Sequence, residues 1–253
     1  MDASVQGQPD DALDIEPRSH EEVTRRAVAL AILVRRAALE ERNPDGGEQE
    51  AFERETDRFE LYSWAVKEFG DTILQDEREL LRTPAGGLSP EAIDTCLAAI
   101  LPAEALRWAL GLAERLDLLA DPDALVEPLM SWCPVPWEDV TTFARRHTLR
   151  PDERLAEERE RWELWHWRST LDPTDHDPNE DLNAVVADVA REAATAGLIQ
   201  VVEGDFAVDT RPFRALSADE RTAIADRAEA NLLALNWVCG FGETWDTVPL
   251  YPD

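Results

Sequence analysis

Apolar residues recur at helical spacing along most of the chain, and residues 217–246 show the pattern most completely. Ser217 and Glu220 match a capping box, in which the hydroxyl and the carboxylate satisfy free backbone N–H groups at the start of a helix. Gly240 favours a left-handed helix end. Between these signals, five apolar residues share one face of a helix: Ile224, Ala228, Leu232, Leu235 and Val238. The pattern predicts a buried-face helix that ends before Gly240 and is followed by a short loop.

Several helices are predicted in the first hundred residues. The first begins at Ser19, where Glu22 completes another capping box, and the second spans about residues 48–69. A shorter helical piece covers residues 71–82, and Ser89 followed by a proline marks the start of the next helix. The large apolar residues of the second helix fall on one stripe: Phe52, Phe59, Tyr62, Val66 and Phe69.

The middle of the chain predicts a central helix and a tryptophan-rich one. Residues 102–119 are apolar around more than half of a helix circumference, which is typical of a buried helix, and Gly111 within it is interpreted as allowing a close helix contact. Segment 131–137 (SWCPVPW) reads as an irregular crossover, followed by a helix over residues 137–147. Pro151 begins a long helix that carries three tryptophans on different faces: Trp162, Trp165 and Trp167.

The last third combines helices with a short β-hairpin. A helix from Leu182 to Gly197 precedes two strand-like segments, 198–202 and 206–208. Residues 172–181 form an acidic, proline-containing loop and the candidate hinge, and residues 1–17 are polar and aperiodic, which predicts a disordered acidic tail. We therefore expect a mainly α fold: one multi-helix bundle over residues 18–253, with a small β-hairpin near the C-terminal third.

A net charge of −29 narrows the choice of partners. Binding to nucleic acid requires clusters of lysine and arginine that neutralise phosphates, and anionic membranes make the same demand. We therefore expect neither nucleic-acid nor membrane binding, and a basic protein partner would be attracted instead. Solvated acidic helix faces, or adaptation to a salty cytoplasm, would produce the same charge. The chain shows no signal peptide and no long apolar run, so we expect a cytoplasmic protein.

Seven fragments, in order, resemble an uncharacterised bacterial family, domain of unknown function 4272. They are RRAVALAILVRRAALEE (25–41), WAVKEFGDTIL (64–74), LSPEAIDTCL (88–97), EALRWALGLAERL (104–116), WHWRS (165–169), GDFAVDTRPFRALSADE (204–220) and LALNWVCGFGETWDTVPL (233–250). The most specific part is the W-A-L-G sequence combined with the late L-N-W and W-D. The chain departs from the family at Asn231, where the family tends to carry arginine, and at its end, Leu250-Tyr-Pro-Asp253. The resemblance implies a single helical domain and no particular activity.

No catalytic or metal-binding signature is present. Glu163 and His166 form a single E-x-x-H, whereas helical di-iron bundles need two such motifs and two further glutamates. Gly240-x-Gly242 follows a helix rather than a strand, which excludes a nucleotide-binding loop. The three cysteines are widely separated in apolar surroundings, which favours inert buried thiols over a disulfide framework or a zinc site. We therefore expect no catalytic residues, no cofactor and no metal.

One cluster stands out as a candidate functional or interface site: Trp165, His166, Arg168, Asn236, Trp237, Trp245 and Asp246. Buried indole N–H groups need partners, so a packed junction that holds the C-terminal loop would use these residues. An exposed surface of tryptophan and arginine that anchors a partner would use them as well. The preferred hypothesis is a non-catalytic interaction or adaptor protein, with an immunity-like role as one version. The alternatives are an enzyme or ligand-binding protein with a pocket around His166, Arg168, Asn236 and Asp246, and a structural subunit of a homo-oligomer.

Overall fold

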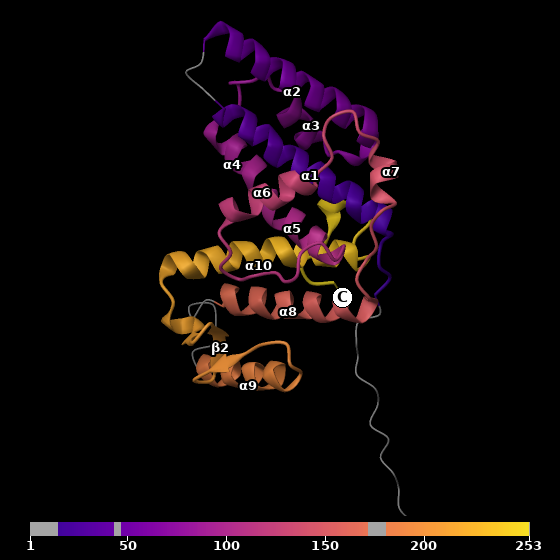
Figure 1. The fold of residues 1–253 in the computed structure, drawn as a ribbon. Coiled ribbons are helices and arrows are strands. Elements are labelled where there is room, and N and C mark those ends of the chain that lie inside the picture. Colours follow the sequence, from indigo (N-terminus) through magenta and orange to yellow (C-terminus); the bar gives the residue numbers. More distant parts are fainter. Residues whose placement is uncertain (1–14, 43–46, 172–180, 253) are drawn as a thin grey trace, which may run out of the picture.

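Helix α1 (His20–Glu41) runs through the centre of the first half of the molecule (Figure 1). The computed structural model describes residues 15–42, 47–171 and 181–252. Ser19 accepts a hydrogen bond from the backbone N–H of Glu22, and the Glu22 carboxylate accepts one from the N–H of Ser19, which confirms the capping box. Every residue from Ala27 to Val34 is buried, because α2, α4, α5 and α7 all pack around this helix.

The helices around α1 form the first half of the molecule. Helix α2 lies at its outer end, and the short α3 and α4 lie between α2 and the rest (Figure 1). The bounds are α2 (Glu48–Phe69), a 3₁₀ turn (Gly70–Thr72), α3 (Gln75–Arg82), α4 (Pro90–Ala98), α5 (Ile100–Ala109), α6 (Pro122–Trp132) and α7 (Val140–Ala144).

Two long helices, α8 (Asp152–Thr170) and α10 (Ala218–Val238), lie side by side across the middle of the molecule (Figure 1). Beyond α8 lies a small unit made of α9 (Leu182–Thr195) and three short antiparallel strands. Strand β1 (Val201–Val202) pairs with β2 (Asp205–Val208), and β2 pairs with β3 (Arg211–Pro212). The fold is therefore mainly α with a small antiparallel sheet, as the sequence predicts, although β3 was not expected.

The helix predicted for residues 102–119 is wrong in its second half. Helix α5 ends at Ala109, and Gly111 (φ 74°) has the left-handed conformation that ends a helix rather than a place inside one. The Arg150 guanidinium donates hydrogen bonds to the carbonyls of Trp108 and Ala113, both at 2.7 Å, and so binds the turned-out chain on both sides of the glycine. Leu112 is consequently exposed instead of buried.

Other local differences concern residues around prolines and at the N-terminus. Residues 122–132 form the helix α6, which the sequence pattern does not predict. The helix expected at 137–147 is shorter and covers only Val140–Ala144. The candidate hinge lies almost wholly outside the described residues, as do residues 1–14. Residues 15–17, expected to be disordered, instead pack along the end of α10, where the Glu16 N–H donates to the Cys239 carbonyl. Gly240 permits this contact, since a Cβ there would lie 2.4 Å from the Glu16 carbonyl oxygen.

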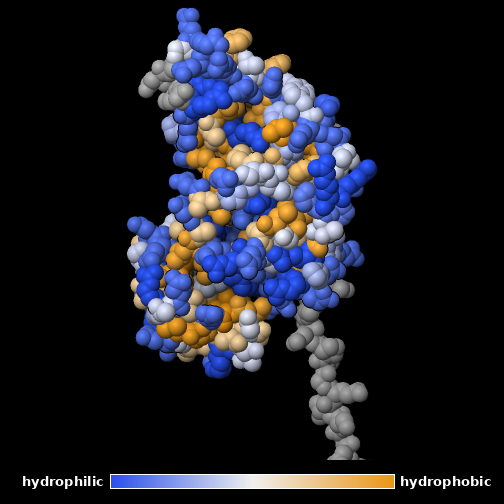
Figure 2. Space-filling model, viewed as in Figure 1, coloured by the Kyte–Doolittle hydropathy of each residue, from blue (hydrophilic) through white to orange (hydrophobic). Residues whose placement is uncertain are grey.

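The apolar stripe of α2 is not the buried face of that helix. The face turned inward carries Leu61, Trp64 and Ala65, together with the arginines Arg54 and Arg58. Of the stripe that the sequence shows, Phe69 is buried, Tyr62 and Val66 are half-buried, and Phe52 and Phe59 are exposed. Figure 2 shows isolated hydrophobic positions on the otherwise hydrophilic outer ridge formed by α2.

Candidate functional site

The C-terminal segment packs against α8 and α10 through His166 and Asn236. The Asn236 side-chain NH₂ donates to the carbonyls of Pro249 (2.8 Å) and Leu250 (2.9 Å), and its side-chain oxygen accepts a hydrogen bond from the Arg159 guanidinium at 2.7 Å. The hydroxyl of the next residue, Tyr251, lies 2.6 Å from the His166 Nδ1. Burial lowers the pKa of His166, although the nearby Glu229 carboxylate acts in the opposite direction. The neutral imidazole is therefore the favoured form in this contact.

Trp165 and Arg168 face the small sheet instead. The Trp165 ring packs edge-on against Phe206, with centroids 5.3 Å apart, and Arg168 donates two hydrogen bonds to the carboxylate of Asp205, at 2.7 and 3.0 Å. Asp205 is 1% exposed and also accepts from the backbone N–H groups of Phe206 and Arg214. Burial raises the pKa of this carboxyl, but the hydrogen bonds from Arg168 and Arg214 outweigh burial, so the pKa is lowered. This ion pair ties the sheet to α8.

Trp237 and Trp245 form a third contact, on the side of α1. Their rings meet edge to face with centroids 5.3 Å apart. The Arg18 guanidinium lies 4.7 Å from the Trp237 ring centroid and donates to the Trp237 carbonyl, while the Arg26 guanidinium lies 4.4 Å from the Trp245 ring centroid. Cation–π contacts of this kind hold the loop after α10 against α1. Asp246 is exposed, accepts a hydrogen bond from the Thr244 hydroxyl at 2.7 Å, and has a lowered pKa for that reason.

The predicted residues therefore lie in three neighbouring contacts around α8 and α10, not in one cleft. Arg168 lines a hollow of about 610 Å³ beside α9, and Trp245 lines a separate hollow of about 330 Å³ beside α10. None of the cavities identified among the described residues is lined by two of the pocket residues His166, Arg168, Asn236 and Asp246. The arrangement can hold residues 15–18, residues 249–251 and the sheet in place.

A larger groove of about 860 Å³ lies between α8, the loop after α5 and the α9–sheet unit. Trp108 and Trp165 contribute to its lining, and hydrophobic residues gather over the α9–sheet unit at that end of the molecule (Figure 2). The arginines along it are already engaged: Arg161 pairs with Glu158, Arg154 with Glu157, and Arg115 with Asp117. The groove thus has the size of a ligand site, with its arginines paired internally.

The cysteines are buried and show no sign of activation. All three are free thiols, and burial raises the pKa of Cys96 to about 11 and those of Cys133 and Cys239 to about 12. Such thiols remain protonated at neutral pH and are poor nucleophiles. In the part of the chain that the structure describes, no group of three or more His, Cys, Asp or Glu could hold a metal ion.

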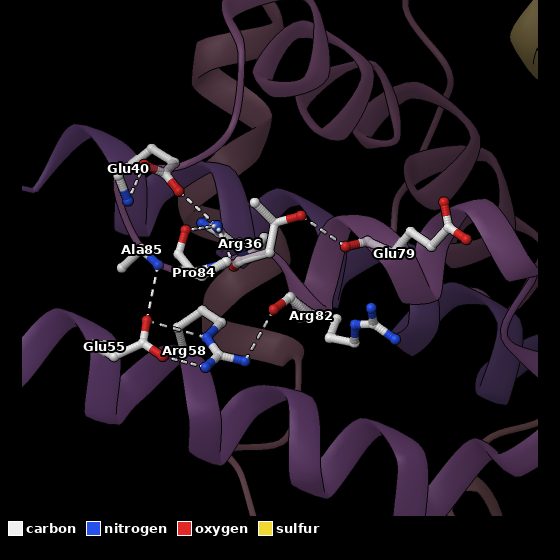
Figure 3. A network of polar contacts seen from close by, with 10 residues as sticks. Arg36, Glu40, Glu55, Arg58, Glu79, Arg82, Pro84 and Ala85 are labelled. Carbon is white, nitrogen blue, oxygen red and sulfur yellow. Dashed lines mark hydrogen bonds and ion pairs between the residues drawn. The ribbon is translucent and has the colours of Figure 1, made fainter.

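Buried arginines are the main feature that the sequence analysis did not identify. Figure 3 shows the loop after α3, residues 83–86, bound on both sides by charged side chains of α1 and α2. Arg36 donates to the Thr83 and Pro84 carbonyls, Glu40 accepts from the Gly86 N–H at 2.7 Å, and Glu55 accepts from the Ala85 N–H at 2.8 Å. Arg36 and Glu40 also form an ion pair at 2.5 Å, with both side chains almost fully buried. Their i, i+4 spacing is visible in the sequence, but it is equally common on exposed helices.

The fold and these contacts define a mainly α, acidic protein stabilised internally by arginine. The family described as Domain of unknown function (DUF4272) matches residues 9–207, and the chain belongs to this family. The expected resemblance is thereby confirmed. The match ends before the late L-N-W and W-D fragments, so it does not extend to Asn231, which is buried here. No curated protein and no solved structure matches the chain. None of the described helices is both long enough and apolar enough to cross a membrane.

Proposed function

We propose that this protein is a non-catalytic cytoplasmic interaction protein that binds a basic protein partner. The observation that carries the proposal is how charge is divided between interior and surface. Within the described ranges, only three carboxylate residues are buried, Glu40, Glu77 and Asp205. Seven arginines are buried: Arg26, Arg36, Arg54, Arg58, Arg107, Arg159 and Arg227. Most carboxylates of the described residues therefore lie outside the core, on the surface of a chain with a net charge of −29.

The buried arginines serve the fold, and three of them also pair with carboxylates outside the core: Arg58 with Glu55, Arg107 with Glu104 and Arg159 with Glu163. Arg227, for example, donates to the Ala120 carbonyl, and Arg26 pairs with Glu77. A surface left this acidic attracts cationic proteins over distances of about 10 Å at moderate salt and accelerates their association. An immunity-like protein that neutralises a basic partner is one concrete form of this function.

An affinity pull-down from native lysate, at low and at moderate salt, tests the proposal. A stoichiometric partner of high isoelectric point, whose binding weakens as salt increases and is reproduced with the purified protein, is the expected result. The proposal would be contradicted if light scattering shows a monomer and the pull-down recovers no stoichiometric partner. A homo-oligomer with no other partner would favour the structural-subunit alternative.

The second candidate function is small-ligand binding, which the groove of about 860 Å³ favours. A ligand that binds only the folded state raises the melting temperature, so a thermal-shift screen with metabolites and metals tests this candidate directly. Leu119→Arg, at an exposed position of the groove lining, should abolish any such shift. If the shift persists in this variant, the ligand binds elsewhere.

A further inference from the structure

The outer face of α2 carries two exposed phenylalanines. Phe52 is 69% exposed and Phe59 is 59% exposed, which is unusual for side chains of this size. They lie seven residues apart, so they share one face of the helix, about 10 Å apart along its axis. Thr56 and Ser63 occupy the same face. The buried side of α2 is the opposite one, and the Arg58 guanidinium lies 5.8 Å from the centroid of the Phe59 ring.

A line of carboxylates runs beside the phenylalanines. Glu53 and Glu60 each follow a phenylalanine by one residue and are exposed, so the aromatic–acidic pair repeats after two helical turns. A spacing of seven residues is the period with which a second helix packs along a first. The face therefore has an apolar ridge whose edge is acidic at Glu53 and Glu60 and ends at Lys67, which pairs with Glu68. Its acidic part suits a helix with apolar residues at the same period and basic residues beside them.

A third exposed aromatic residue, Trp137, is held at the same end of the molecule. It is 53% exposed and has a φ of 75°, a left-handed conformation that costs a non-glycine residue about 1–2 kcal/mol. The loop that carries it is fixed to α2, because the Trp64 indole donates to the Glu138 carbonyl at 2.9 Å and Glu68 accepts from the Val140 N–H at 3.1 Å. The loop that carries Trp137 is thus attached to α2 at Trp64 and Glu68.

Charge decides what kind of helix can cover this surface. A second copy of the chain, with its net charge of −29, would bring two acidic edges together. The same repulsion disfavours the acidic N-terminal residues of this chain as the occupant. A segment with arginine or lysine beside its apolar residues would instead pair with Glu53 and Glu60 while covering the aromatic rings.

We propose that the outer face of α2, together with Trp137, is the docking surface for a basic amphipathic helix of a partner protein. This inference rests on the proposed function and assigns it to one face. Phe52 and Phe59 supply the apolar anchors, and Glu53 and Glu60 supply the charges that orient the incoming helix. Trp137 contacts its flank.

The probe is a fluorescein-labelled helical peptide with leucine at every seventh position and arginine on the flanking positions, used where it is monomeric. Anisotropy should show binding to the full-length protein. The double variant Phe52→Ser, Phe59→Ser should bind at least about tenfold more weakly, as expected for the loss of hot-spot anchors. The control Leu112→Ser changes an exposed apolar residue elsewhere and should bind as the wild type does.

A second pair of variants distinguishes binding at this surface from general electrostatic attraction of the basic peptide to the acidic protein. Glu53→Gln, Glu60→Gln should weaken binding and reduce its salt dependence more than Glu153→Gln, Glu192→Gln, which removes two exposed charges from α8 and α9. The proposal would be overturned if the peptide does not bind the wild type. It would also be overturned if the two glutamine double variants have equal effects and the Phe52→Ser, Phe59→Ser variant binds as the wild type does. A dimer that dissociates when Phe52 and Phe59 are replaced would overturn it as well.

The partner recovered by pull-down separates failure of the docking surface from failure of the proposed function. If that purified partner still binds the Phe52→Ser, Phe59→Ser variant, the surface assignment fails and the proposed function stands. If the peptide binds as predicted but no partner is recovered, the surface assignment stands and the function of the whole protein is overturned.

Discussion

Asp205 shows how much a single buried carboxylate can determine in this protein. It lies at the start of β2 and accepts hydrogen bonds from the Arg168 side chain and from two backbone N–H groups. The Arg168 guanidinium in turn lies 4.4 Å from the Phe213 ring centroid. One residue of α8 thus holds the sheet, and the strength of that attachment depends on keeping both charges paired.

Arg168→Ala should destabilise the protein by about 3–5 kcal/mol, because it leaves the Asp205 carboxylate buried without its main partner. Urea unfolding followed by circular dichroism measures the loss. Arg191→Ala is the matched control, since Arg191 pairs with Asp188 at the surface, and it should cost less than about 0.5 kcal/mol. Equal effects of the two substitutions would show that the Arg168–Asp205 pair does not stabilise the fold.

His166 should make stability depend on pH in the weakly acidic range. Its pKa is lowered in the folded state, so the unfolded chain, with a histidine pKa of about 6.5, binds the proton more readily. The contribution of the neutral imidazole is fully present above pH 6.5 and is lost as the pH falls through the folded-state pKa. Urea unfolding between pH 7.5 and 5 should give a shallower decrease for His166→Gln than for the wild type.

His147 provides an internal comparison for this experiment. Burial lowers its pKa as well, and its Nε2 accepts a hydrogen bond from the Trp132 indole at 3.1 Å. His147→Gln should therefore remove a second part of the pH dependence, and the double variant should remove more than either single one. A His166→Gln variant with the same slope as the wild type would exclude His166 as a source of the effect.

At the scale of elements, the ends and stripes of the helices were predictable where the signals are local. Ser19 and Ser217 cap the helices that they were expected to cap, and α8 and α9 lie where the pattern placed them. The failure at residues 110–119 has a distant cause: Arg150 binds carbonyls on both sides of Gly111. The apolar pattern around Gly111 does not include Arg150, which lies about forty residues later in the chain. The local pattern alone therefore predicts that the helix continues past Gly111.

The contacts of Arg36 and Glu40 with loop 83–86 lead to a prediction at the scale of elements. Arg36→Met should cost about 3–5 kcal/mol, since it leaves Glu40 as an unpaired buried charge and removes the donor to the Thr83 and Pro84 carbonyls. Adding Glu40→Gln should restore part of this loss, giving a coupling energy of about 1–3 kcal/mol in a double-mutant cycle. Urea unfolding of the four proteins measures it. Strict additivity would mean that the two side chains act independently.

At the scale of the whole molecule, the acidic surface opposes its own compaction. Like charges on the surface repel one another, and added salt screens that repulsion within a Debye length of about 10 Å at 0.1 M. The melting temperature should therefore increase by several degrees between 0.01 and 0.5 M sodium chloride. A decrease would indicate that the internal arginine pairs, rather than surface repulsion, dominate the response to salt.

The candidate cluster was only partly predictable, for a reason that concerns the whole molecule. The sequence shows Trp165, His166 and Arg168 close together, and Asn236 and Trp237 close together, but not their partners. Those partners come from remote segments: Asp205, Tyr251 and Arg18. Helix α8 turns successive side chains to different faces, so neighbours in sequence enter different contacts.

The sequence by itself determined the mainly α class, most helix boundaries, the family and the strongly acidic character. Helix capping and apolar periodicity are properties of short segments, and net charge is a sum over all residues, so none of them depends on how the chain folds. Only the tertiary structure decided that seven arginines are buried within the described residues, that α5 ends at Ala109 and that α2 turns Phe52 and Phe59 outward. Each of these outcomes depends on a free-energy balance between groups far apart in the chain. A buried guanidinium is stable only where carbonyls or carboxylates from other segments meet it, and an apolar stripe is covered only where another element reaches it.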